Sequence, residues 1–393
     1  MTEREAQNGQ WNAAAVSGAW PPPDPGATAA TSGPHGVGGG PSGPHQVGGV
    51  PSGPYGVAGG PSGPHAVDPQ RTPGGGYPQQ HSPAHDLSAA QLLPQTKRPP
   101  QTGWRRALFV ASGGTVNVGE SPTDVQRREL ITRVNQPLHG CYKIAMLSLK
   151  GGVGKTTITT TLGSTFASLR GDRVIAVDAN PDRGTLSQKI PLETTATVRH
   201  LLRDAQRIRR YSDIRAYTSQ GPSRLEILAS EQDPAVSEAF SEDDYRRTVT
   251  LLEHFYNIVL TDCGTGLMHS AMKGVLDLAG SLVLVSSGSI DGARSASATL
   301  DWLDAHGYHE LVARSVAVIN SVRPTSGKVD LDRVAQHFAA RCRAVCRMPF
   351  DEHLEEGGEI DLDRLGPRAR LAALELAATV ADDFPNAAAR FAP

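Results

Sequence analysis

From Lys143 onward, short apolar runs alternate with longer stretches in which apolar residues recur at helical spacing. Seven runs have the length of a buried strand: KIAMLSL, RVIAVDA, LEILAS, YNIVLTD, SLVLVSS, VAVIN and RAVCRM. Strands that alternate with helices are typical of a parallel sheet with crossover connections. The pattern therefore predicts an α/β fold with a doubly wound, mostly parallel sheet. In such a fold, ligands bind at the carboxyl ends of the strands.

The first hundred residues lack this pattern. Glycine and proline are concentrated before about residue 103, where long apolar runs are nearly absent. Ser-Gly-Pro followed by His or Tyr recurs there every ten residues, from Ser32, Ser42, Ser52 and Ser62. A chain of this composition cannot bury enough apolar surface to offset the entropy lost on ordering. We therefore expect residues 1–102 to be a disordered tether. Metal binding by the repeated histidines and contact of the rings with a partner are alternatives to simple repeat expansion.

The composition becomes globular from residue 103. We expect a lead-in arm over residues 103–140, in which TDVQRRELITRVNQPLHG predicts a helix capped near Thr123 or Asp124. The main domain is expected over residues 141–385, followed by a flexible tail at 386–393.

Charge and targeting signals exclude several classes of protein. The formal net charge is −2, so no global field points to nucleic acid or membrane. No run of about 18 apolar residues occurs, and the first residues lack the basic and apolar regions of a signal peptide. The four cysteines show no spacing typical of disulfides or zinc ligands: Cys141, Cys263, Cys342 and Cys346. We expect a cytoplasmic protein that does not insert into the membrane.

The sequence KGGVGKTT follows the first apolar run and precedes a helical pattern. Glycines allow the backbone to fold around a phosphate chain, and the helix N-terminus adds positive potential. Lys155 is expected to contact the β and γ phosphates, and Thr156 to offer a hydroxyl to Mg²⁺. The predicted nucleotide-binding residues of this loop are Gly151, Gly152, Val153, Gly154, Lys155, Thr156 and Thr157.

The pattern G-x-x-x-x-G-K-[ST] fails here, because Leu149 occupies the position of the first glycine. The loop instead resembles the deviant Walker A loop of the MinD/ParA ATPases, which carries an additional lysine. The resemblance implies that 141–385 is a P-loop ATPase domain with ATP and Mg²⁺ as cofactors. It also implies that Lys150 reaches the phosphates of a second subunit in an ATP-dependent homodimer.

Three other segments extend the resemblance. VIAVDANPDRGTL matches the family's switch I, which makes Asp178 a magnesium ligand. YNIVLTDCGTG matches the Walker B strand and switch II; it gives Asp262 a role in holding Mg²⁺ and brings Gly264 near the γ-phosphate. VAVINSVRP and CRMPFDEH match segments that contact the base, which implies nucleotide contacts for Asn320 and Pro349.

One departure from the family concerns hydrolysis. Relatives commonly carry a second acid two residues after the switch I aspartate, whereas this chain has Asn180, with Asp182 nearby. Phosphoryl transfer depends mainly on positioning and charge stabilisation. We therefore expect Asn180 or Asp182 to place the attacking water and hydrolysis to be slow. A catalytically silent ATP-binding scaffold remains the alternative.

The arm and the loop together resemble the MinD/ParA-like ATPases found with actinobacterial type VII (ESX) secretion systems. This resemblance implies a regulator or accessory of protein secretion, with a partner that could recruit it to the inner face of the membrane. A partition-type ATPase is an alternative, with DNA contacts from Arg207, Arg209 and Arg210 and from Arg364, Arg368 and Arg370. An iron-sulfur carrier, which would need paired cysteines, is a further alternative.

Overall fold

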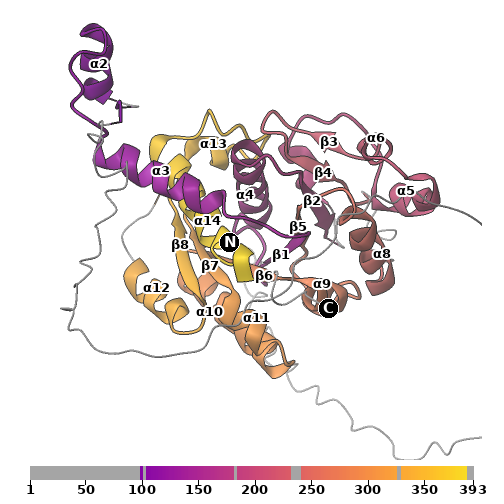
Figure 1. The fold of residues 1–393 in the computed structure, drawn as a ribbon. Coiled ribbons are helices and arrows are strands. Elements are labelled where there is room, and N and C mark those ends of the chain that lie inside the picture. The colour runs from indigo at the N-terminus through magenta and orange to yellow at the C-terminus, as the bar shows by residue number, and fades with distance from the viewer. Residues whose placement is uncertain (1–97, 101–102, 181–183, 232–239, 325–328, 387–393) are drawn as a thin grey trace, which may run out of the picture. The chain divides into compact units, whose positions relative to one another are not determined.

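The carboxyl ends of seven parallel strands define one edge of the molecule's single described sheet (Figure 1). The computed structural model describes residues 98–100, 103–180, 184–231, 240–324 and 329–386, all within a compact unit that spans residues 86–393. The strand order is β3-β4-β2-β5-β1-β6-β7-β8. The strands are β1 Tyr142–Leu147, β2 Val174–Ala179, β3 Ser219–Gln220, β4 Glu226–Leu228, β5 Ile258–Cys263, β6 Ser281–Ser287, β7 Val316–Asn320 and β8 Ala344–Met348.

The predicted fold class is confirmed. Each of the seven apolar runs contains one strand of the parallel sheet, from β1 to β8 without β3. The remaining strand, β3, pairs antiparallel with β4 at the edge of the sheet. The sequence did not predict β3, because two residues without an apolar run carry no strand signal. The predicted disordered segment lies outside the described residues, apart from residues 98–100.

Helices cover both faces of the sheet (Figure 1). The main helices are α2 Gly103–Ala111, α3 Pro122–Val134, α4 Lys155–Leu169, α8 Glu242–Leu252, α9 Met272–Leu278, α10 Ile290–Ala305, α12 Leu331–Ala339 and α14 Pro367–Ala381. Shorter ones are α5 Val198–Arg203, α6 Tyr211–Arg215, α11 His309–Arg314, α13 Glu352–Glu355 and the 3₁₀ helices η1 Leu186–Lys189 and η2 Ala205–Arg207.

Alternation along β1 shows how the sheet separates two cores. Ile144 and Met146 point to the face covered by α3, α4 and α14. Ala145 and Leu147 point to the opposite face, which is covered by α8 to α12. Because successive side chains of a strand leave on opposite faces, a strand between two helical layers must be apolar throughout. This explains why the seven runs are continuous rather than alternating.

The lead-in region contains two helices of different character. The cap of helix α3 is Ser121, two or three residues before the expected cap at Thr123 or Asp124, and Asp124 completes the capping box. Its Arg133 forms two hydrogen bonds with the carboxylate of Asp382, at 3.0 and 2.6 Å, beyond the end of α14. Helix α2 buries none of its residues, and the side chain of Trp104 is 67% exposed. None of the helices in the described ranges is both long and apolar enough to cross a bilayer.

Candidate functional site

The loop between β1 and α4 lies at the carboxyl edge of the sheet and has the backbone of a phosphate-binding loop. Gly152 and Gly154 have φ values of 74° and 84°, in the left-handed region that favours glycine. A Cβ atom on Gly154 would lie 2.3 Å from the side-chain nitrogen of Asn320. That nitrogen donates a hydrogen bond of 2.8 Å to the carbonyl of Val153. The strand β7 therefore supports the loop through Asn320, and only glycine fits at residue 154.

Lys155 opens α4 and points into the site. Its ammonium group donates to Oδ1 of Asp262 at 2.6 Å, and the residue is only 8% exposed. The hydroxyl of Thr156 donates to Oδ2 of the same carboxylate at 2.6 Å. Thr159, one turn further along α4, donates to Oδ1 at 3.1 Å. The end of β5 and the start of α4 are thereby joined through a single buried carboxylate.

Asp178, the penultimate residue of β2, lies beside Asp262, because the two residues are partners in the register of the parallel strands. Its carboxylate accepts hydrogen bonds from two backbone N–H groups, those of Asn180 and Leu186, both at 3.1 Å. Burial, and next to it the charge of Asp262, raises the pKa of Asp178 to about 7. Two carboxylates that share a site with low water access favour a nearby cation.

These groups fit a nucleotide with a magnesium ion. Magnesium is usually held by one or two carboxylates together with substrate phosphates and water rather than by a full set of protein ligands. Asp178, Asp262 and the hydroxyl of Thr156 provide such a partial set. Across the described ranges, no group of three or more His, Cys, Asp or Glu side chains could form a metal site without further ligands. The buried ammonium of Lys155 is suited to a phosphate.

The side chain of Lys150 is more exposed than that of Lys155. Its backbone is held by Ser148, whose hydroxyl donates to the Lys150 carbonyl at 2.8 Å. Its side chain is 41% exposed and reaches only the exposed Asp291 of α10, at 3.8 Å. An exposed ion pair at this distance holds a side chain weakly. The loop therefore fixes the position of Lys150 while its ammonium group faces solvent.

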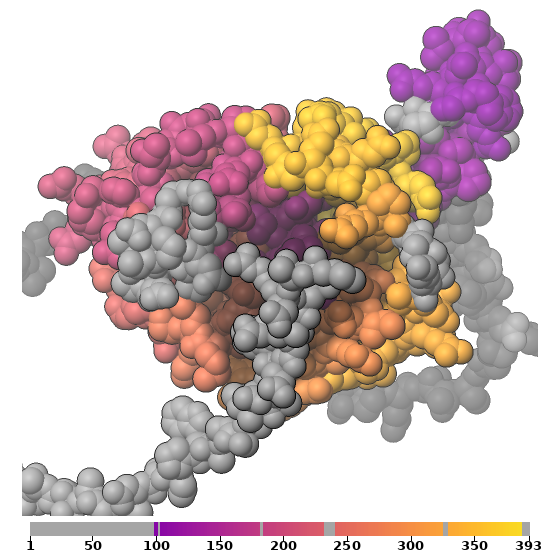
Figure 2. Space-filling view, turned by 180° about the vertical axis from the view of Figure 1, so that it is seen from behind, coloured from indigo at the N-terminus to yellow at the C-terminus, as the bar shows by residue number. Residues whose placement is uncertain are grey.

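A cavity of about 640 Å³ adjoins the loop. Figure 2 shows a hollow on this side of the molecule, where purple atoms from the early part of the described chain are seen between pink, orange and yellow segments. The cavity is lined by Lys150, Gly151, Gly152, Val153, Ser287, Gly288, Ser289, Asn320, Ser321, Val322, Arg323, Pro324, Val329, Leu331 and Glu355. Asn320, for which the resemblance implies a nucleotide contact, is one of the residues that line this cavity.

Three other residues predicted to contact the nucleotide or the attacking water are not among those that line the cavity. Pro349 follows β8 and is half-buried but does not line the cavity. Asp351, two residues on, caps α13 by accepting from the backbone of His353 at 3.1 Å. Gly264 directly follows β5 and is buried. Asp182 lies outside the described residues.

Sequence reasoning missed three residues around the loop: Thr159, Asp291 and Arg323. Thr159 is four residues after Lys155, so the helical period places both on the side that faces Asp262. This spacing is readable from the sequence. Asp291 and Arg323 reach the loop from α10 and from the segment after β7, and no local pattern connects them to it.

Two of the four cysteines are buried, and two of the clustered arginines contact other groups of the domain. Burial raises the pKa of the Cys263 thiol to about 12 and raises that of Cys342 as well, so both thiols stay protonated at neutral pH. Arg364 pairs with Glu356 at 2.7 Å. Arg370 donates to the backbone carbonyls of residues 363 and 365.

Comparisons with known proteins agree with this geometry. Residues 144–359 match the family model described as the CobQ/CobB/MinD/ParA nucleotide binding domain. The chain belongs to this family. A ParA family ATPase from Chlorobium tepidum shares the MinD/ParA fold, with a TM-score of 0.52 at 17% identity over 61% of this chain and 98% of that one.

Two relatives with similar sequences also match this MinD/ParA chain. It is 39% identical over 340 residues to the ESX-1 secretion-associated protein EspI of Mycobacterium tuberculosis, a match that covers 81% of this chain and 51% of EspI. The chain therefore aligns with about half the length of that relative. It is 25% identical over 189 residues to a putative septum site-determining protein MinD of Guillardia theta, which covers 48% of this chain and 66% of the relative. The resemblance inferred from the sequence is confirmed.

Proposed function

We propose that this chain binds ATP with Mg²⁺, forms a homodimer around the nucleotide and hydrolyses it slowly. The observation that carries the proposal is the convergence of Lys155 and Thr156 on Asp262, with Asp178 beside it. Lys155 would bind the β and γ phosphates, and Thr156, Asp178 and Asp262 would hold the metal. The ion would supply positive charge that offsets the charge of the phosphates.

Phosphate binding at this site would replace existing contacts rather than add to an empty surface. Lys155 now donates to Asp262, so its ammonium group would divide its hydrogen bonds between Asp262 and the phosphates. The left-handed glycines allow backbone N–H groups of the loop to face the phosphates. The cavity beside Asn320 is the space we assign to the nucleoside.

Lys150 supports the dimer. An exposed lysine on a fixed loop, held only by a weak pair with Asp291, can extend toward a second subunit at little cost. The ATP-bound dimer would be the active state, and nucleotide hydrolysis or exchange would separate the subunits.

Hydrolysis is proposed to be slow because Asn180 stands where a second acid is common in relatives. An amide can hold a water molecule but cannot accept its proton. Asp182 is the nearby carboxylate that could assist. The loose transition state of phosphoryl transfer needs little base catalysis, so a low rate remains consistent with this arrangement.

The similarity to EspI supports a role in, or alongside, type VII protein secretion. We propose a cytoplasmic regulator or accessory that acts through a protein partner, and that partner could bring it to the inner face of the membrane. Residues 103–140 would act as a lead-in arm to the ATPase domain over 141–385, with the repeats before them as a tether.

The decisive experiment combines ATP turnover with molar mass from light scattering. Wild type and Lys150→Ala would be compared with ATP, with ADP and without nucleotide, and Lys273→Ala would serve as an exposed-lysine control. We expect a dimer only with ATP, lost in Lys150→Ala, which should still bind ATP. A monomer under all conditions would contradict the proposed switch. Dimerisation without turnover would favour the silent scaffold.

A further inference from the structure

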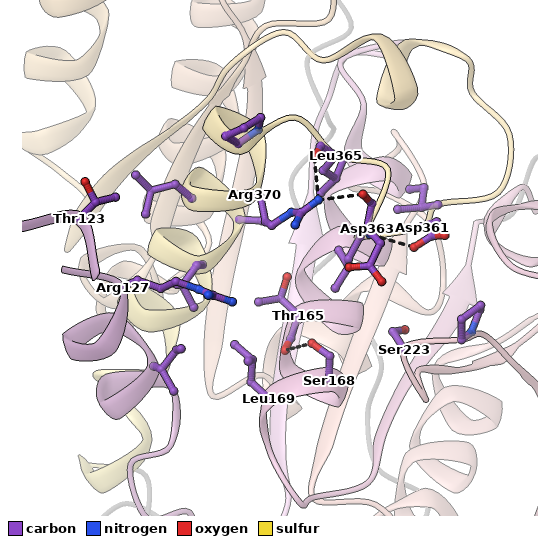
Figure 3. Close-up of a pocket in the computed structure, with 18 residues that line it drawn as sticks. Thr123, Arg127, Thr165, Ser168, Leu169, Ser223, Asp361, Asp363, Leu365 and Arg370 are labelled. Carbon is purple, nitrogen blue, oxygen red and sulfur yellow. Dashed lines mark hydrogen bonds between the residues drawn. The ribbon is translucent and has the colours of Figure 1, made fainter. Parts of the chain in front are cut away.

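A second cavity lies away from the phosphate loop, between α3, α4 and α14. Its volume is about 510 Å³, within the range of sites that bind small molecules or peptide side chains. Figure 3 shows its walls: α3 on one side, the end of α4 below, and the segment before α14 above. We call this cavity the α3–α14 groove. Its lining combines aliphatic side chains with four charged ones, those of Arg127, Asp361, Asp363 and Arg370.

The floor of the groove is apolar and incompletely covered. Ile131, Leu169, Leu362 and Leu371 come from four different segments, and each is only partly buried against the main core. A monomeric protein seldom leaves several aliphatic side chains half-covered at the bottom of one cavity. Their common exposure indicates that another apolar group completes this part of the core.

The lining carries both signs of charge, because Arg127 and Arg370 are basic and Asp361 and Asp363 are acidic. Figure 3 shows Arg127 extending from α3 into the groove, and this arginine forms no ion pair within the described ranges. Arg370 donates to the carbonyls of Asp363 and Leu365 at 2.8 and 3.0 Å. The side chain of Asp361 accepts from the backbone of Asp363 at 2.8 Å. Of the two arginines, Arg127 is therefore the one that remains available within the described ranges, and it can pair with an acid of the occupant.

One segment of the chain has the matching chemistry. Leu87, Leu92 and Leu93 are the first three leucines of the sequence, and residues 86–93 contain no Gly or Pro. Asp86 provides an acid at the start of this segment. The Gly- and Pro-rich repeats before it contain isolated Val and Tyr residues but no comparable cluster of apolar side chains. Residues 86–93 thus combine leucines for the floor with a carboxylate for Arg127.

The segment can reach the groove. Thirty positions separate Leu93 from Thr123, which lines the groove near the start of α3. Residues 94–102 lie between Leu93 and the start of α2, and these nine residues can span about 30 Å when extended at about 3.3 Å each. This reach exceeds the length of α4, which is about 22 Å at 1.5 Å per residue. A tethered segment also binds at millimolar effective concentration, so a modest affinity is sufficient.

We propose that residues 86–93 of this chain bind in the α3–α14 groove of the same molecule, with leucine side chains on the floor and Asp86 near Arg127. Binding there anchors the repeat segment to the face covered by α3, α4 and α14. Thr165 and Leu169 belong to the last turns of α4, whereas Lys155 begins that helix. The bound segment would therefore lie about 15 Å or more from the phosphate loop and leave the nucleotide cavity open.

Photo-cross-linking in the full chain tests the proposal. We would place benzoylphenylalanine at Leu92 and, in a control chain, at the exposed Leu108 of α2. We expect intramolecular cross-links from residue 92 to residues 123–131 or 360–374. Cross-links to the groove from residue 108 but not from residue 92 would overturn the proposal and make α2 the occupant. A cross-linked dimer on a denaturing gel would overturn the intramolecular form.

Substitutions make the assignment specific. Leu87→Ser with Leu93→Ser should lower the cross-link yield from residue 92 at least tenfold, because two apolar side chains that would be buried on the floor are lost. Tyr77→Ser, outside the segment, should leave the yield unchanged. Arg127→Glu should reduce it about threefold, as expected for a partly exposed ion pair. Arg368→Glu, on an exposed position of α14 outside the lining, is the matched control. Equal yields in Arg127→Glu and Arg368→Glu would show that Arg127 does not select the segment.

Discussion

Two groups of buried carboxylates lie on the same sheet, and they are satisfied in different ways. Glu226 in β4 is 1% exposed, and its Oε2 accepts from the hydroxyls of Tyr256 and Thr218 at 2.6 and 2.7 Å. Its Oε1 accepts from the hydroxyl of Tyr211. Arg215 adds a positive charge 3.9 Å from Oε2. Burial, followed by the interaction with Glu226, raises the pKa of Tyr211 to about 12, so this phenol keeps the proton that it donates.

Asp178 and Asp262 lie side by side with fewer compensating groups. Asp262 receives Lys155 and two threonine hydroxyls, whereas within the described ranges Asp178 receives two backbone N–H groups. Burial, and next to it the charge of Asp262, raises the pKa of Asp178. The comparison teaches that burial alone does not mark a functional carboxylate. Glu226 has its hydrogen-bond partners within the chain, whereas the proposed Mg²⁺ would add positive charge beside the aspartate pair.

The largest effect is expected from removing the carboxylate of Glu226 from its hydrogen-bond network. Glu226→Ala should lower the free energy of unfolding by about 3 kcal/mol, because three hydroxyl groups lose their acceptor in a buried position. Urea unfolding would measure this change, and Glu226→Gln, which keeps one carbonyl acceptor, should lose less. Nucleotide affinity should be the same in both variants. Wild-type stability of Glu226→Ala would show that the network contributes little.

A substitution beside the aspartate pair should affect nucleotide binding rather than stability. Lys155→Ala should lower ATP affinity about 100-fold, because a buried charged hydrogen bond to phosphate is lost. Titration with a fluorescent ATP analogue would measure the affinity. Lys273→Ala, which removes an exposed lysine on α9, should bind as wild type does. Unchanged affinity of Lys155→Ala would refute the assignment of the phosphate loop.

The pKa of Asp178 predicts how stability varies with pH. The unfolded carboxyl ionises near pH 4, about three pH units below the folded value of about 7. Between these values the folded state holds more protons than the unfolded state, so stability of the nucleotide-free protein should fall as pH rises from about 4 to 7. Urea unfolding across this range would show the slope, and Asp178→Asn should flatten it. Addition of MgATP should restore stability at pH 7. A slope that Asp178→Asn leaves unchanged would assign the titration to another group.

The smallest expected effect is a change in the rate of ATP hydrolysis. Asn180→Asp should raise the ATPase rate a few-fold, because a carboxylate accepts a proton that an amide does not. Phosphate release measured at saturating ATP would detect the increase, and Asn180→Ala should show no increase. Equal rates in Asn180→Asp and wild type would direct attention to Asp182.

Most of the fold could be read from the sequence because strands buried on both faces are continuous apolar runs. The runs located β1, β2 and β4 to β8, and the glycines and lysine of one loop indicated the loop that we propose binds phosphate. Strand β3 escaped prediction because its pairing depends on the neighbouring β4 rather than on its own two residues. The cap of α3 was misplaced by two or three residues, since Ser121 and Asp124 share the capping box.

The sequence by itself determined which residues of the loop have the chemistry to bind phosphate, because this information is local and lies within eight residues. Only the tertiary structure decided that Asp178 and Asp262 are register partners, that Asn320 supports the loop, and that Glu226 is closed by Tyr211 and Tyr256. These contacts join positions that are 30 or more residues apart in several cases. Their geometry follows from strand order, which no local pattern encodes.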